Sequence, residues 1–153
     1  MADTSLSENR IGLLIWKTSN YWQTRLRKIL RPHNLSLNEF LILESIHHLH
    51  SIKSKTHQNV ISNFIGIDIS VASVIFKSLE SKNYISRQFE SDNRKKIVKM
   101  LEGGKILFDD ISPLIKKEGK LMFEKLKNET FNFTNSLKLL LGKKIRIKAE
   151  KQK

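Results

Sequence analysis

The sequence has 153 residues, of which 28 are Lys or Arg and 15 are Asp or Glu, giving a formal net charge of +13. Hydrophobic residues make up 39% of the chain, which is enough for a packed core and argues against wholesale disorder. The absence of cysteine excludes a disulfide scaffold, a thiolate zinc site and a thiol-based redox sensor. The excess of positive charge favours a polyanionic partner, either nucleic acid or an anionic membrane surface.

The sequence also bears on where the protein works. The first ten residues, MADTSLSENR, are polar and lack the charged-then-apolar pattern of a secretory signal. No apolar run approaches the roughly 20 residues that a membrane-spanning helix needs. We therefore expect a cytoplasmic protein without a membrane partner.

The chain begins with two predicted helices. In residues 8–31 apolar side chains recur at three- and four-residue steps, which is typical of an amphipathic helix, and Pro32 ends it. Ser36 and Glu39 have the spacing of a capping box, in which each side chain satisfies a free backbone amide. The pattern predicts a second helix from there to about Leu49.

Two shorter helices follow a polar connector at 50–56. The first has Ile61, Phe64 and Ile65 on one face and is expected to end at Gly66. The second runs from Ser70 to about Ser81. Either Asp68 or Ser70 can cap its start, and Asn83 suits a left-handed end. Two helices joined by a tight, glycine-containing link indicate a helix-turn-helix.

The periodicity then changes to two, which predicts a β-hairpin. Residues 84–89 and 95–100 alternate as strands do, and Ser91-Asp92-Asn93 forms the turn between them. The basic residues of this hairpin are Arg87, Arg94, Lys95, Lys96 and Lys99. An arginine at the tip suits the minor groove of DNA, and lysines along the strands suit phosphates. The alternative is a hairpin whose charges only keep the protein soluble.

The C-terminal part is again helical. After Gly103-Gly104 a long helix is expected to about Glu129, with Ser112-Pro113 as a candidate kink. Thr134 can cap a last helix whose apolar face comprises Leu137, Leu140, Leu141 and Ile145. The basic tail at 143–153 is open to three interpretations: a solvated helix end, a second phosphate contact or a membrane-surface element.

Four short motifs resemble the MarR (multiple antibiotic resistance regulator) family. In chain order they are Asn83-Tyr84-Ile85-Ser86-Arg87, Asp92-Asn93-Arg94, Ile97-Val98-Lys99-Met100 and Glu102-Gly103-Gly104-Lys105. They are similar to the family's recognition-helix exit, wing-tip D-x-R, returning strand and entry to the fifth helix, and the likeness covers about residues 8–149. The resemblance implies a mainly α fold with a small β-hairpin wing, in a single domain over residues 1–153. The winged helix-turn-helix lobe would span about 35–101, with dimerisation helices at about 8–31 and 103–149.

By the same resemblance the protein is a homodimer whose first, fifth and sixth helices form the interface. Each protomer would place one helix in a major groove of double-stranded DNA and one wing over the flanking minor groove. The function expected is a sequence-specific transcriptional regulator, acting as a repressor. The alternative is a MarR-like dimer that binds DNA without strong sequence preference, or that acts through a protein partner.

The candidate DNA-binding residues are Ser70, Ser73 and Lys77 on the recognition helix and Arg87, Asn93, Arg94, Lys95 and Lys96 in the hairpin. Two alternatives remain for the serines, since Ser70 can simply cap the helix and Ser73 can simply face water. The family commonly carries Thr-Arg and Asp-Arg pairs on this helix, where this chain has Ser73-Val74 and Lys77-Ser78. Lys77 thus replaces the acidic residue that often holds the wing arginine.

Two further groups of residues have a functional and a structural interpretation. His47, His48 and His50, with Glu44 and His57 nearby, form the candidate metal cluster, although histidines at a helix C-terminus often serve only its dipole. We predict no bound metal. The aromatic set Trp16, Tyr21, Trp22, His33 and Phe40 either lines a small-molecule effector pocket or belongs to the core. The effector, if the protein has one, is not predicted.

The sequence contains no motif of an enzyme. It has no phosphate-cradling glycine loop, no nucleophile motif and no convincing pair of catalytic carboxylates. We expect neither catalysis nor a cofactor.

Overall fold

The computed structural model describes residues 10–91 and 95–144. The predictions on Asn93, Arg94, Ile145 and most of the basic tail therefore lie outside the described residues. The chain divides into two compact units, one ending at Ile115 and the other beginning at Lys116.

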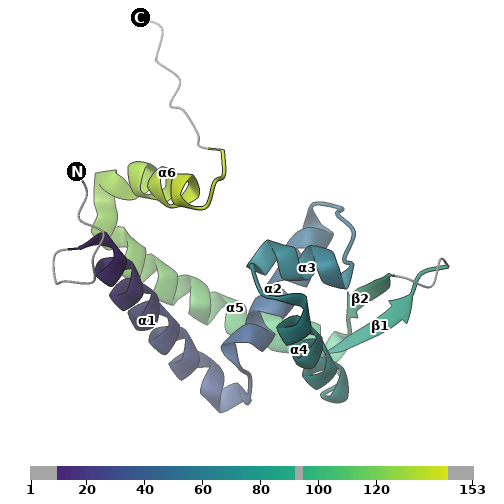
Figure 1. Ribbon diagram of the computed structural model, residues 1–153. Coiled ribbons are helices and arrows are strands. Elements are labelled where there is room, and N and C mark those ends of the chain that lie inside the picture. The colour runs from purple at the N-terminus through teal and green to yellow at the C-terminus, as the bar shows by residue number, and fades with distance from the viewer. Residues whose placement is uncertain (1–9, 92–94, 145–153) are drawn as a thin grey trace, which may run out of the picture. The chain divides into compact units, whose positions relative to one another are not determined.

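The fold is mainly helical with one two-stranded antiparallel hairpin, which confirms the predicted fold class (Figure 1). The elements of the first unit are α1 (Ile11–Leu30), the 3-10 turn η1 (Arg31–His33), α2 (Leu37–Ser51), α3 (Gln58–Ile65), α4 (Ile69–Ser81), β1 (Ile85–Phe89) and β2 (Lys96–Met100). Helix α5 (Glu102–Phe123) follows, and the 3-10 segment η2 (Glu124–Glu129) and α6 (Thr130–Leu140) complete the described chain.

The predicted capping box at the start of α2 is present. The hydroxyl of Ser36 accepts a hydrogen bond from the backbone N–H of Glu39 at 3.1 Å, and the Glu39 carboxylate accepts one from the backbone N–H of Ser36 at 3.0 Å. Both backbone amides are thereby satisfied at a point where no helical carbonyl can reach them. This fixes the angle at which α2 enters the core.

The turn between α3 and α4 is the one that the sequence predicts. Gly66 ends α3 in the left-handed conformation, with φ of 81°, which costs glycine little. Of the two candidate caps for α4, Asp68 is the cap: its Oδ1 accepts from the backbone N–H of Ser70 at 2.8 Å and from the Ser70 hydroxyl at 2.6 Å. Asn83, with φ of 60°, takes the expected left-handed conformation after α4.

In the described part of the chain one core lies among the end of α1, α2, α3, α4, the hairpin and the first part of α5. Its largest fully buried side chains are Leu30, Phe40, Ile42, Leu43, Ile61, Phe76, Leu79, Ile85, Val98 and Ile111. Phe64 does not belong to it, contrary to the helical pattern: the side chain is exposed, and its ring stacks on that of His48 with the centroids 5.2 Å apart. Helix α4 and the hairpin therefore pack against the same core.

The hairpin pairs from Ile85 opposite Met100 to Phe89 opposite Lys96. The connector before α3, predicted only as a polar link, also contacts it. The backbone N–H of Val98 donates to the carbonyl of Thr56 at 2.9 Å, and the Thr56 hydroxyl donates back to the carbonyl of Val98 at 2.7 Å. This short third segment supports β2 from the side that β1 leaves open.

Helix α5 differs from its predicted bounds at both ends. It begins at Glu102, so that Gly103 and Gly104 lie in its first turn, and it continues through Pro113 without a break. The chain leaves helical geometry instead at Lys127, with φ of 46° and ψ of −121°. The candidate kink at Ser112-Pro113 is therefore not where the helix ends.

The last helix starts one turn earlier than predicted. Helix α6 begins at Thr130, and Thr134 lies inside it, with its hydroxyl donating to the carbonyl of Thr130 at 2.7 Å. The prediction of Thr134 as a cap is wrong, because its hydroxyl bonds back to the preceding turn rather than to a free amide.

The helices that the structure describes can be compared with the length and hydropathy that a membrane span requires. No single helix there is long and apolar enough to cross a membrane, and α3 with α4 meets the length and composition requirement only as a pair bent by 113°.

Candidate nucleic-acid interface

The side of α4 that faces away from the core is exposed. Ala72, Phe76 and Leu79 are buried on the inner side of the helix. Ser70, Ser73, Val74 and Lys77 are exposed. Because a helix turns by about 100° per residue, positions 70, 74 and 77 share the outer side, opposite the buried row. The second helix of the helix-turn-helix therefore presents a free face along most of its length.

Arg87 ties the hairpin to this helix. Its Nε and Nη2 donate to the two carboxylate oxygens of Glu80 in α4, at 3.1 and 3.0 Å. Its Nη1 donates to Oε1 of Gln58 in α3 at 3.0 Å. The Arg87 side chain is only 9% exposed. One guanidinium thus joins α3, α4 and β1, and it does so from a position behind the exposed surface.

This pairing also affects the acid–base behaviour of Glu80. The hydrogen bond from the Arg87 side chain, with the positive charges of Arg87 and Lys96, holds the pKa of Glu80 below its ordinary value of 4.5, against a smaller upward effect of burial. Sequence reasoning missed Glu80. The available signal was the acidic residue type of Glu80 itself. It lies in the last turn of α4, where the helix is followed directly by β1.

A second contact holds the far end of β1. Nε2 of His57 lies 3.0 Å from Oε2 of Glu90, and the imidazole is 5% exposed. The distance suits an ion pair when the imidazole is protonated, although the geometry does not make a hydrogen bond. The backbone N–H of Glu90 donates to the carbonyl of Lys95 at 2.9 Å. β1 is therefore tied to α3 and α4 through Arg87 in its middle, and the residue just after it, Glu90, lies against His57.

The lysines of the hairpin lie on its accessible surface. Lys95 and Lys99 are exposed, and Lys96 is half-buried with its Nζ 5.0 Å from the centre of the exposed Phe89 ring. A cation over a ring face is held by the negative potential of the ring. The described hairpin thus offers cations on a strand pair whose first strand, β1, contacts α4 (Figure 1).

A third polar cluster connects the C-terminal end of α4 to the start of α2. Nζ of Lys82 lies 3.0 Å from Oε2 of Glu39 and donates to the backbone carbonyl of Asn34 at 2.9 Å. The hydroxyl of Ser78 donates to the same carboxylate oxygen at 3.2 Å. Burial raises the pKa of Glu39, but the hydrogen bonds from Ser36 and Lys82 and the Lys82 charge outweigh it and hold that pKa below 4.5.

The predicted DNA-binding residues thus fall into three groups. Ser70, Ser73 and Lys77 lie together on the outer face of α4, and Lys95 and Lys96 lie on the hairpin. The Arg87 side chain is largely covered in the contact with Glu80 and supports the hairpin from behind. Asn93 and Arg94 lie outside the described residues. Contact of these side chains with DNA stays a prediction.

The histidines do not gather around a common point. The His47 ring is tilted against that of Phe108 with the centroids 4.7 Å apart, His48 stacks on Phe64, and His57 lies against Glu90 near the turn of the hairpin. Within residues 10–91 and 95–144 no group of three His, Asp or Glu side chains could hold a metal ion.

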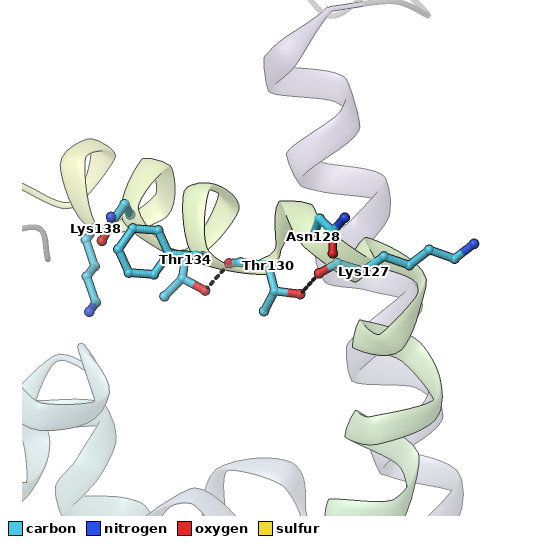
Figure 2. Close-up of a pocket in the computed structure, with 7 residues that line it drawn as sticks. Lys127, Asn128, Thr130, Thr134 and Lys138 are labelled. Atoms are coloured by element: carbon cyan, nitrogen blue, oxygen red, sulfur yellow. Dashed lines mark hydrogen bonds between the residues drawn. The ribbon is translucent and has the colours of Figure 1, made fainter. Parts of the chain in front are cut away.

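The aromatic residues in and after α1 differ in burial. Phe40 is buried in the core, 6.0 Å from the ring of Phe108, whereas Trp16 and Tyr21 are exposed on α1. The core interpretation therefore fails for Trp16 and Tyr21, and the effector-pocket interpretation stays a prediction. An open hollow of about 400 Å³ lies along η2 and α6, where Lys127 and Lys138 mark its two ends (Figure 2). Its remaining lining residues are Asn128, Thr130, Phe131, Thr134 and Asn135.

The arrangement defines a class of protein. Two helices joined by a tight turn, followed by a hairpin anchored to the second of them, make a winged helix-turn-helix protein. Residues 35–97, which hold this unit, match the MarR family. The match is thus to the segment that forms the winged helix-turn-helix.

Two curated relatives are similar over most of their length. The chain is 26% identical over 132 residues to YdcH of Bacillus subtilis, described as an uncharacterized HTH-type transcriptional regulator, which covers 85% of this chain and 88% of the relative. It is 25% identical over 144 residues to the HTH-type transcriptional regulator SarZ of Staphylococcus haemolyticus, which covers 92% of both chains.

Solved structures share the fold. A MarR-family transcriptional regulator from Rhodococcus sp. RHA1 matches 94% of this chain and all of its own, with a TM-score of 0.77 and 19% identity. MepR of S. aureus, solved as a complex with DNA, matches 88% of this chain and 98% of its own, with a TM-score of 0.77 and 17% identity. A mutant MarR from E. coli, solved with operator DNA, matches 86% of this chain and 91% of its own, with a TM-score of 0.66 and 22% identity.

Proposed function

We propose that this chain is a MarR-family transcriptional regulator, a homodimeric repressor that binds double-stranded DNA sequence-specifically. Helix α4 would enter a major groove, and the hairpin would lie over the flanking minor groove. The observation that carries the proposal is the exposed outer face of α4, with Ser70, Ser73 and Lys77, beside a hairpin that is anchored by Arg87 and carries exposed lysines. The protein would act in the cytoplasm and without catalysis.

The charge of the chain supports a DNA partner. The net charge of +13 favours association with a polyanion, and Lys95, Lys96 and Lys99 suit phosphates on either side of the groove. Arg94 at the tip of the hairpin would enter the minor groove, where the narrow channel concentrates negative potential. MepR and MarR, which share this fold, have both been solved with DNA.

A homodimer is supported by apolar side chains that the single chain leaves exposed. They are concentrated on three helices: Ile11, Leu14, Ile15 and Trp16 on α1, Ile106, Leu114 and Leu121 on α5, and Leu137, Leu139 and Leu140 on α6. Exposed apolar surface on this scale is typical of an interface rather than of a monomer. Light scattering after gel filtration should give twice the mass of one 17.8 kDa chain. The variant Leu140→Glu should shift that mass towards the monomer if α6 lies in the interface.

The function is tested by selecting bound fragments from the source genome, with competition by bulk DNA at fixed, near-physiological salt. Enrichment of a short pseudo-palindrome would support a sequence-specific dimeric regulator, and loss of transcription from a reporter carrying it would support repression. Binding that falls steeply with salt and enriches no sequence would favour the alternative of degenerate DNA binding. A chain that binds no DNA would contradict the proposal and direct the search to a protein partner.

A further inference from the structure

The outer face of α4 carries apolar side chains where a DNA-reading helix ordinarily carries polar ones. Val71 and Val74 are 49% and 69% exposed, and their spacing of three residues makes them neighbours on the helix surface. Val74 lies four residues after Ser70 and three before Lys77, so it is a surface neighbour of both. Since the buried row of α4 lies on the opposite side, Val74 stands near the middle of the face proposed to enter the groove.

Neither helix formation nor solubility accounts for valine at these positions. A β-branched side chain loses rotamer freedom in a helix, so an exposed helical site gains nothing from it. Single exposed apolar residues are common on protein surfaces. Here, however, Val71 and Val74 lie three residues apart and form one exposed apolar pair next to Lys77. A partner with apolar groups of its own would explain them.

The charges around the patch indicate what that partner is. Lys77 lies on the same face, and Lys95 and Lys99 are exposed on the adjoining hairpin. The occupant must therefore be anionic and still present apolar groups at the centre of the contact. The major groove of DNA meets both conditions, because each thymine displays a C5-methyl group there and phosphates line the groove.

We propose that Val71 and Val74 contact thymine methyl groups in the major groove, so that sequence preference depends on the number and position of thymines. Ser70 and Ser73 fit this scheme, since a hydroxyl bonds to several base edges and by itself discriminates little. The inference deepens the proposed function and rests on it. It assigns specificity to the two positions at which this recognition helix is least polar.

The test replaces thymine by deoxyuridine in the DNA. This exchange removes one methyl group and leaves the charge and the base pairing unchanged. The enriched duplex is synthesised with either base at each thymine of the two half-sites, and the dissociation constant of the full chain is measured at fixed salt. Removing one buried methyl should weaken binding about three- to fivefold, since a buried CH₂ is worth about 0.8 kcal/mol.

Two variants assign the effect to the helix. At the thymine that Val74 contacts, exchange for deoxyuridine should no longer change the affinity of Val74→Ser. Because the side chain is exposed, circular dichroism should show that the variant keeps its fold. Lys77→Ala is the matched control on the same face. It should weaken binding to both duplexes by the same factor and leave their ratio unchanged.

The outcomes separate the inference from the function on which it rests. A preferred sequence that binds equally with thymine and deoxyuridine would overturn the methyl contact and leave the regulator standing. A ratio that persists in Val74→Ser would overturn the assignment to Val74. A chain that binds none of the duplexes would overturn both, and the valine patch would then be tested as a surface for another protein.

Discussion

Arg87 and Glu80 join the hairpin to the recognition helix through two parallel hydrogen bonds of 3.1 and 3.0 Å. A bidentate pair of this kind fixes direction as well as distance, because the guanidinium plane and the carboxylate plane must align. The angle between wing and helix is thus set inside the protein, before DNA is bound. We therefore expect Arg87 to act in DNA binding by holding other side chains in place.

The first prediction concerns the stability that this pair provides. Arg87→Ala removes three hydrogen bonds, while the Glu80 carboxylate, which is 41% exposed, can regain water. We expect a loss of about 1–2 kcal/mol in the free energy of unfolding, measured by urea denaturation. Arg87→Lys keeps the charge but not the bidentate geometry, so its loss should lie between those of Arg87→Ala and the natural chain.

Lys99→Ala is the matched control, since Lys99 is an exposed cation of the same hairpin. Its unfolding free energy should stay within about 0.5 kcal/mol of the natural chain. Equal stability of Arg87→Ala and Lys99→Ala would show that the contact with Glu80 does not hold the hairpin.

The second prediction concerns pH. The pKa of Glu39 is lowered from 4.5, so its contribution to stability is fully present above that value and is lost as the pH falls through the lowered pKa. Lys82→Met removes one of the groups that lower the pKa. In this variant the loss of stability should therefore begin at higher pH than in the natural chain.

The complementary variant is Glu39→Gln, in which no proton can be taken up at this site. Urea midpoints measured between about pH 6 and pH 3 should fall less steeply with acid in Glu39→Gln, although its stability at neutral pH is lower because Lys82 loses its partner. Identical pH slopes in the two chains would exclude Glu39 as a source of acid sensitivity.

The third prediction uses the two neighbouring glycines of α5. A Cβ on Gly104 would overlap the backbone carbonyl of Tyr84, whereas one on Gly103 would lie 3.5 Å from the carbonyl oxygen of Asn83, an ordinary contact. Gly104→Ala should therefore cost about 1–3 kcal/mol, because the obstacle is backbone that joins α4 to the hairpin. Gly103→Ala should be neutral or stabilising by up to about 1 kcal/mol. Thermal unfolding of both variants checks the contrast, and equal melting temperatures would contradict the close approach.

The features that could be predicted from the sequence are those with local causes. The capping box of Ser36 and Glu39, the turn at Gly66 and the end of α4 at Asn83 each depend on a few consecutive residues. The pairings of Arg87 with Glu80, of Thr56 with Val98 and of His57 with Glu90 could not be predicted in this way. They join elements whose relative position is set only by the common core.

The wrong predictions have the same origin. Thr134 has the residue type of a cap, but the chain already becomes helical at Thr130, and Phe64 has helical spacing but lies beside His48 outside the core. In the candidate site, the exposed positions of α4 were predictable, because the apolar residues that are buried recur at helical spacing on the opposite side. The position of Arg87 behind the surface was not, because its partner Glu80 belongs to another element.

The fourth prediction separates contact with DNA from support of the wing. Arg94→Ala should weaken DNA binding by about 1–3 kcal/mol and reduce the preference for flanking sequence, without changing the free energy of unfolding. Arg87→Ala should weaken DNA binding too, but together with a measurable loss of stability, because it acts through the position of the hairpin. Lys77→Ala should lower affinity alike on all sequences if the lysine contacts only phosphate, and on the preferred sequence alone if it reads a base.

The measurement that distinguishes these roles is binding by each variant to the preferred duplex and to bulk DNA at two salt concentrations, beside its urea unfolding curve. Loss of one phosphate contact should reduce the slope of log affinity against log salt by about one. An Arg94→Ala chain with unchanged affinity at moderate salt would remove Arg94 from the interface. The hairpin would then contribute through Lys95 and Lys96, and Lys95→Ala should weaken DNA binding more than Arg94→Ala does.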